Sequence, residues 1–91
     1  MDKREGAELK REEAIVEAVL FTMGKSVELR QLAAAIGKSE EEAKEAVSEL
    51  SRRYDREKRG LRIIELSGSY QMCTRAEYYE NLIRVAKAPK K

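Results

Sequence analysis

The side chains that most often perform catalysis are scarce in this chain. It contains no histidine, which removes the commonest general base and metal ligand. Its single cysteine, Cys73, has no histidine with which to form a thiolate–imidazolium pair, and the sequence has no glycine-rich phosphate-binding loop. We interpret Cys73 as a small packing residue in a strand, with a redox sensor as the weaker alternative. We therefore expect no catalytic residue, no metal site and no cofactor, in a protein that is not an enzyme.

Two charged clusters remain as candidate sites. The carboxylates of Glu40, Glu41 and Glu42 follow Ser39 in the pattern of a helix capping box, so they suit the positive end of a helix dipole better than a metal ion. Successive helical residues lie about 100° apart, which makes these three side chains diverge. The second cluster, from Arg52 to Arg62, has six basic residues against two acidic ones. It fits a solvated helix C-terminus or, alternatively, a phosphate-binding patch.

Hydrophobic periodicity predicts the elements that position these clusters. Helices are expected over about 8–23, over about 28–36, and from Ser39 until Gly60 ends the run; the last of these has a buried side formed by Ala43, Ala46, Val47, Leu50 and Tyr54. Two β-rich runs, 61–66 and 70–74, flank Ser67-Gly68-Ser69 and predict a hairpin. A second capping box, Thr74–Glu77, is expected to start a final helix that ends before Pro89.

This order of elements predicts an α+β fold, a mostly helical winged helix-turn-helix. It has three helices, a β-hairpin wing and a C-terminal helix in one domain over 1–91, with a flexible lead-in at 1–7 and a tail at 88–91. The first helix is apolar on two sides. Leu9, Val16, Leu20 and Met23 form one side, extended by Ile15 and Val19, while Ala14, Ala18 and Phe21 lie on another.

The predicted fold commonly reads DNA, yet its predicted contact surface has the wrong charge. The second helix of the motif would enter the major groove with its N-terminal end. From Ser39 to Leu50 this helix has five acidic residues against Lys44 alone. The wing turn, Ser67-Gly68-Ser69, has no charge, and the basic cluster lies at the far end of the helix. Specific DNA binding is therefore not expected.

Surplus apolar residues indicate a protein partner instead. Tyr78 and Tyr79 are about 100° apart on a helix, so both can be half-buried with their hydroxyl groups in water, as at protein interfaces. The alternative is that these side chains form the edge of a thin core. The interface candidates are Ala14, Ala18, Phe21, Tyr70, Met72, Tyr78, Tyr79 and Ile83.

Composition limits the compartment and the class of protein. The chain is 42% hydrophobic and 40% charged, which suits a soluble globular domain. No run approaches the roughly 18 apolar residues that a membrane span requires, and no signal peptide is recognisable. One cysteine excludes an intrachain disulfide and indicates a reducing compartment. We expect an intracellular protein.

Several segments together form a recognisable pattern: Glu17–Phe21, Leu29–Ala33, Leu50–Tyr54, Arg59–Leu61 and Ser69–Tyr78. The pattern resembles the segregation and condensation protein B family, specifically its N-terminal winged-helix domain, from about Ala14 to Leu82. The most specific parts are Glu-Ala-x-Leu-Phe and the series Arg-Gly-Leu, Tyr-Gln and Thr-Arg-x-Glu-Tyr. Lys25-Ser26 and Ala76 depart from the family pattern, which tends to have Glu-Pro and Pro there; both changes affect turn or helix-start geometry.

The resemblance implies a scaffold subunit of the prokaryotic SMC–kleisin complex for chromosome condensation and segregation. Such a subunit forms a homodimer, binds the kleisin subunit and through it the SMC ATPase, and lies in the cytoplasm in association with the nucleoid. The family typically has two winged-helix domains, whereas this chain has room for one, so we expect a fragment or a minimal relative. The alternative function is a DNA-binding winged-helix transcription regulator that uses the basic cluster.

Overall fold

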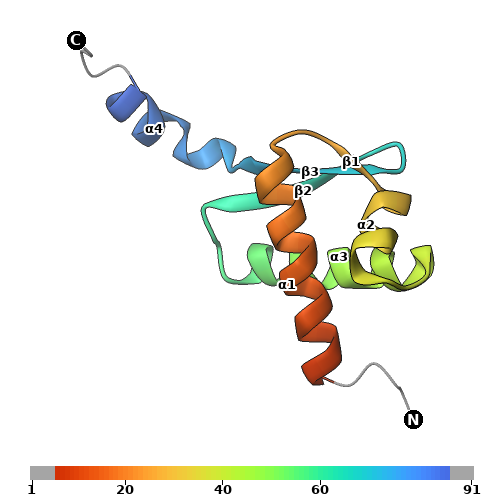
Figure 1. Ribbon diagram of the computed structural model, residues 1–91. Helices are drawn as coiled ribbons and strands as arrows, with labels where there is room; N and C mark the ends of the chain where they lie inside the picture. Colours follow the sequence, from red (N-terminus) through yellow and green to blue (C-terminus); the bar gives the residue numbers. More distant parts are fainter. Residues whose placement is uncertain (1–5, 87–91) are drawn as a thin grey trace.

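The computed structural model describes residues 6–86, and in it three helices pack beneath a small sheet while a further helix projects from one side (Figure 1). The elements in chain order are α1 (Gly6–Met23), β1 (Val27–Glu28), α2 (Leu29–Ile36), α3 (Glu40–Arg56), β2 (Leu61–Leu66), β3 (Ser69–Thr74), the 3₁₀ helix η1 (Ala76–Tyr78) and α4 (Tyr79–Ala86). This arrangement is the predicted α+β winged helix-turn-helix. Helix α1 is described from Gly6; most of the lead-in predicted at 1–7 and the tail predicted at 88–91 lie outside the described residues.

The turn between α2 and α3 is fixed by local hydrogen bonds at both of its ends. Gly37 adopts a left-handed conformation at φ 72°, and its N–H donates to the Ala33 carbonyl, which ends α2. The Ser39 hydroxyl then accepts from the Glu42 N–H, while the Glu42 carboxylate accepts from the Ser39 N–H, each at 3.1 Å. This reciprocal capping box fixes where α3 begins.

Removing the Ser39 cap should weaken the domain measurably. We expect Ser39→Ala to lower the free energy of unfolding by about 1 kcal/mol, because one N–H at the start of α3 loses its acceptor. Ser39→Thr retains the hydroxyl and serves as the matched control in urea melts. Equal melts for Ser39→Ala and the unaltered chain would show that the cap contributes nothing.

The sheet is antiparallel with strand order β1-β3-β2. Ser67 and Gly68 have φ of 48° and 86°, a two-residue turn of the I′ kind that matches the twist of the hairpin. The predicted hairpin is thus confirmed, with β3 beginning one residue earlier, at Ser69. Strand β1 was not predicted. It is only two residues long and forms by pairing Val27 with Tyr70, a contact distant in sequence.

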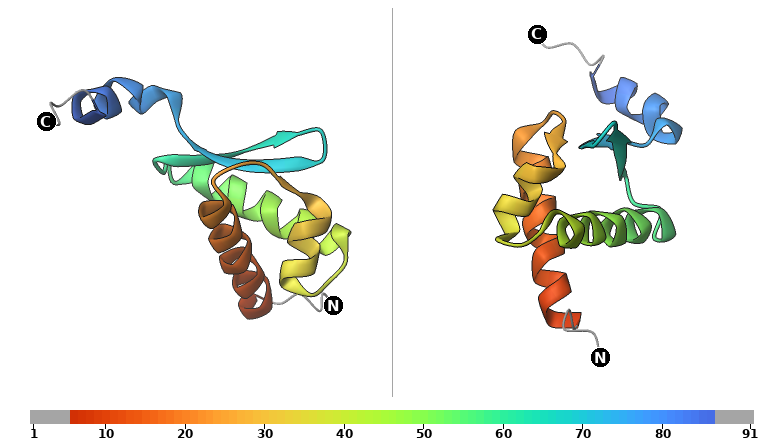
Figure 2. Two further views of the ribbon diagram at one scale, coloured as in Figure 1. Left: turned by 45° about the horizontal axis from the view of Figure 1, so that its top comes forward. Right: turned by 90° about the vertical axis from the view of Figure 1, so that its right-hand side faces the viewer.

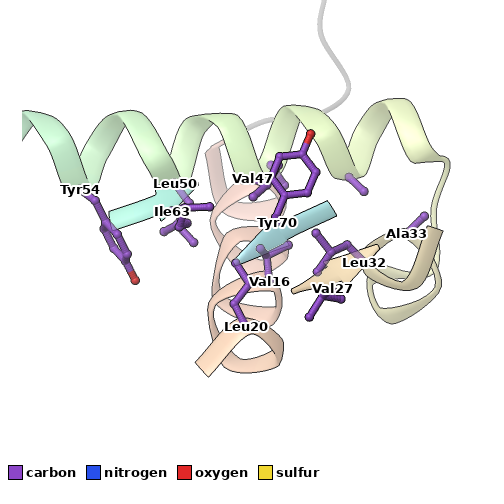
Figure 3. Packing of buried hydrophobic residues seen from close by; sticks show 12 residues of the cluster. Val16, Leu20, Val27, Leu32, Ala33, Val47, Leu50, Tyr54, Ile63 and Tyr70 are labelled. Carbon is purple, nitrogen blue, oxygen red and sulfur yellow. The ribbon is translucent and has the colours of Figure 1, made fainter. Parts of the chain in front are cut away.

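The core lies where α1, α2 and α3 meet the inner face of the sheet (Figures 2 and 3). It consists of Val16, Leu20, Val27, Leu32, Ala33, Ala43, Ala46, Val47, Leu50, Tyr54, Ile63 and Tyr70. All five residues predicted for the buried side of α3 are members. On α1, Val16 and Leu20 are buried as expected, but Met23 is 44% exposed, because it lies in the last turn of the helix.

The start of the last helix differs from the prediction. Thr74 still belongs to β3, paired with Leu61, and the N–H of Arg75 donates to the Gly60 carbonyl at 3.0 Å. The sheet therefore holds this segment extended, and the expected Thr74 cap does not form. Arg75 is the N-cap of η1 without a side-chain cap, and α4 follows only at Tyr79.

Candidate protein-interaction surface

The segment formed by η1 and α4, called the arm below, extends away from the three-helix body (Figures 1 and 2). None of the residues of α4 is buried, although Tyr79, Leu82, Ile83 and Ala86 follow the i, i+3, i+4, i+7 spacing of one helical face. Tyr79 is 63% exposed. A helix of eight residues is marginal in water on its own and takes its stability from packing. The apolar face of the arm therefore suits contact with another polypeptide.

The second apolar side of α1 is also exposed. Val16 and Leu20 face the core, whereas Ala14 and Ala18 are exposed and Phe21 is 74% exposed. An isolated exposed apolar residue is ordinary on a protein surface, but aromatic side chains such as Phe21 are enriched at protein interfaces. Ala14, Ala18, Phe21 and Tyr79 are thus exposed, and their role in an interface stays a prediction.

The remaining candidates differ in their exposure. Tyr78 and Ile83 in the arm are half-buried, and Met72 of β3 packs partly against the core. Tyr70 is only 5% exposed and belongs to the core, because its position in β3 directs its side chain to the inner face with Ile63. Burial, reinforced by the nearby Glu65 carboxylate, raises the pKa of the Tyr70 hydroxyl. Tyr70 is therefore a packing residue rather than part of an exposed apolar patch.

The charges around α3 are acidic at its start and partly paired at its end. Glu40, Glu41 and Glu45 are exposed at its N-terminal half. In the basic cluster, Arg53 pairs with Glu13, Arg52 with Glu49 and Arg59 with Glu57. The hydrogen bond from Arg52 lowers the pKa of Glu49. Arg56, Lys58 and Arg62 remain without an ion-pair partner among residues 6–86.

Two buried carboxylates on α1 connect the three helices, which the sequence did not predict. Glu12 and Glu13 are each 3% exposed. Lys38, just after α2, brings its Nζ within 2.9 Å of a Glu12 oxygen and also contacts Glu8. Arg53 of α3 meets Glu13. The helical spacing could have indicated the burial of Glu12, since Glu12 lies four residues before Val16 on the buried stripe of α1.

A second polar connection holds the end of α3 to the sheet and to α1. The Arg75 guanidinium donates to the Tyr54 carbonyl at 2.8 Å, to the Arg59 carbonyl at 2.5 Å and to Asp55 at 2.8 Å. The Tyr54 hydroxyl donates to Glu17. Burial, together with this hydrogen bond, raises the pKa of the Tyr54 hydroxyl. Arg75 thus fixes the point from which the arm departs.

Within the described chain, no group of three or more His, Cys, Asp and Glu side chains is placed to bind a metal ion. Among the helices from Gly6 to Ala86, none combines the length and apolar character needed to traverse a bilayer. Cys73 is half-buried in β3.

Comparison with known families identifies the family of this chain. The family model described as "Segregation and condensation complex subunit ScpB" matches residues 14–91. The chain belongs to the ScpB family. It is 42% identical over 84 residues to segregation and condensation protein B of Lachnoclostridium phytofermentans. The aligned region covers 92% of this chain and 44% of that protein. The corresponding protein of Agathobacter rectalis is 53% identical over 79 residues, covering 86% and 42%. The chain therefore spans less than half the length of these ScpB relatives.

Solved ScpB structures have the same fold. A crystal structure described as a dimer of ScpB N-terminal domain complexed with ScpA peptide superposes with a TM-score of 0.81 at 41% identity, covering 88% of this chain and 99% of the other. ScpB from Mycobacterium tuberculosis superposes with a TM-score of 0.78 at 20% identity, over 91% of this chain and 53% of that one. The second likeness concerns the fold alone.

Proposed function

We infer that this chain acts as a non-enzymatic scaffold in the SMC–kleisin complex that condenses and segregates chromosomes. In this role it forms a homodimer and binds the kleisin ScpA, and through ScpA the SMC ATPase. Membership of the ScpB family supports the role. The 41% identical solved domain, a dimer complexed with ScpA peptide, supports both partners. It also supports assigning the chain to a single winged-helix domain of the N-terminal type.

The observation that carries this function is the uncovered arm. None of the residues in its stripe, Tyr79, Leu82, Ile83 and Ala86, is buried. The apolar face of an amphipathic helix normally packs against another part of the protein or a partner. Protein interfaces of standard size bury about 800 Å² on each partner, centred on aromatic anchors. Phe21 and Tyr79 are the exposed aromatic side chains suited to that role.

The charges of α3 disfavour the alternative of a DNA-binding regulator. A recognition helix that begins with exposed Glu40 and Glu41 would be repelled by phosphate. Half of the basic cluster, namely Arg52, Arg53 and Arg59, is already paired with carboxylates of this chain. A scaffold of this kind would operate in the cytoplasm, associated with the nucleoid through its partners.

Two titrations distinguish the scaffold from the regulator. We expect calorimetric titration with the ScpA of the same organism to show saturable binding. Labelled duplex DNA at physiological salt should bind no more tightly than the non-specific range of roughly 10⁻⁴ to 10⁻⁶ M. Nanomolar, sequence-dependent DNA binding together with no response to ScpA would refute the scaffold function.

A further inference from the structure

Strand β2 has an open outer edge. Within residues 6–86 it is the last strand of the sheet order β1-β3-β2, and the elements that pack most extensively against it are β3 on one side and α3 beneath. The arm leaves from the end of β3 and projects away from the sheet (Figures 1 and 2). Open strand edges are templates for pairing with another chain, and proteins usually block them.

The register identifies the backbone groups at this edge. Leu66 and Ser69 close a two-residue turn and therefore exchange both ladder hydrogen bonds, as do the pairs Ile64–Gln71 and Arg62–Cys73 by alternation. The N–H and C=O of Ile63 and Glu65 consequently point away from β3. Within residues 6–86, no hydrogen bond from a loop, a cap or a side chain occupies these groups.

A groove lies directly beneath these groups, between β2 and α3. It has a volume of about 310 Å³ and is lined by Val47, Ser48, Ser51, Arg52, Ile63, Glu65 and Tyr70. Ile63 and Glu65 thus present both an open backbone edge and side chains that line the groove. A strand added beside β2 would direct the side chains opposite these residues into it, because directly opposed residues share a face.

The charged side chains that line the groove favour a basic side chain in a bound segment. Arg52 is engaged by Glu49, at 2.5 Å between nitrogen and oxygen. The Glu65 carboxylate has no ion-pair partner in the described chain. The other polar groups on the lining are the hydroxyls of Ser48, Ser51 and Tyr70. A lysine or arginine opposite Glu65 complements this lining. A second copy of β2 would bring a further Glu65 to the same edge.

We propose that an extended, lysine- or arginine-bearing segment of ScpA binds this chain by adding a strand to the open edge of β2. Its basic side chain enters the groove opposite Glu65. This inference rests on the proposed function and specifies where and how the kleisin is held. Backbone hydrogen bonds to Ile63 and Glu65 provide affinity, and the groove provides selectivity.

Amide hydrogen exchange provides a test with an internal control. The probe is the ScpA segment equivalent to the peptide in the solved dimer, added to the full chain at saturation as judged by calorimetry. The amides of Ile63 and Glu65 should then exchange at least about ten-fold more slowly. The amides of Arg62, Ile64 and Leu66 already donate to β3 and should change little. Uniform slowing of all five amides would indicate general tightening and would overturn strand addition.

Substitution of Glu65 tests the groove. Glu65→Lys should weaken peptide binding by about ten-fold, since an attractive cross-strand pair becomes repulsive. Glu57→Lys makes the same charge change on an exposed residue away from the groove, and should leave the affinity unchanged. Circular dichroism melts verify that both variants fold.

The remaining outcomes separate this inference from the proposed function. If the peptide binds while Ile63 and Glu65 exchange as before and Glu65→Lys binds normally, the strand site is wrong and the scaffold function stands. If no ScpA binding is detected, both fail. If the Ile63 and Glu65 amides are already protected in the peptide-free chain and become exposed on dilution, the edge is occupied by a second copy, which also refutes the proposal.

Discussion

The variant Leu82→Glu should sediment as a monomer at concentrations where the unaltered chain is a dimer. Leu82 belongs to the stripe Tyr79, Leu82, Ile83 and Ala86, none of which the body of the domain buries. If the arm contacts a second copy, a glutamate on this stripe places a carboxylate in a desolvated interface, which is unfavourable unless the charge is paired. Truncation of an interface anchor alone costs 2 kcal/mol or more, about thirty-fold in the dissociation constant.

The neighbouring residue provides a matched control for the arm. Asn81 is exposed and lies on the opposite side of α4 from the stripe, since it is two residues, about 200° of rotation, from both Tyr79 and Ile83. Asn81→Glu introduces the same charge and should leave the dimer intact. Analytical ultracentrifugation over a concentration series measures both variants. A dimer that withstands Leu82→Glu and Tyr79→Ala would place the contact on another surface, with Phe21 on α1 the next residue to test.

Local features of this fold followed from the sequence, whereas its long-range contacts did not. The capping box of Ser39 and Glu42 and the turn at Ser67-Gly68 depend on residues a few positions apart, so their chemistry can be read directly. Strand β1 exists only because Val27 meets Tyr70. Thr74 carries a good capping signature, yet its pairing with Leu61 takes precedence. Tertiary hydrogen bonds override local preference at that position.

The candidate surface was predictable to a similar extent. Two apolar sides on α1 cannot both face one small core, and the structure exposes the side with Phe21. The buried carboxylates were missed because charge indicates exposure, and only tertiary structure brings Lys38 and Arg53 to them. Tyr70 was misplaced for a related reason: in a strand the alternation of faces decides exposure, and Tyr70 shares the inner face with Ile63.

Leu50→Ala should destabilise the domain more than substitution at an exposed leucine can. Leu50 is 2% exposed, and Figure 3 shows its side chain directed from α3 toward Ile63 of the sheet. Deleting three buried carbon atoms removes their transfer free energy and leaves a cavity, at a cost of about 2–5 kcal/mol. Small domains have a total stability of about 5–15 kcal/mol, so this loss is a large share. Urea denaturation followed by circular dichroism measures it.

Two control variants make the Leu50 result interpretable. Leu66→Ala deletes the same atoms from a wing residue that is 46% exposed and should cost within about 0.5 kcal/mol, as surface substitutions usually do. Leu50→Met conserves volume and should cost less than about 1.5 kcal/mol. Because self-association adds concentration-dependent stability, all three substitutions belong in the Leu82→Glu background. If, in the Leu82→Glu background, Leu50→Ala lowers the free energy of unfolding no more than Leu66→Ala does, α3 does not present Leu50 to the core. The register of the helix against the wing is then wrong.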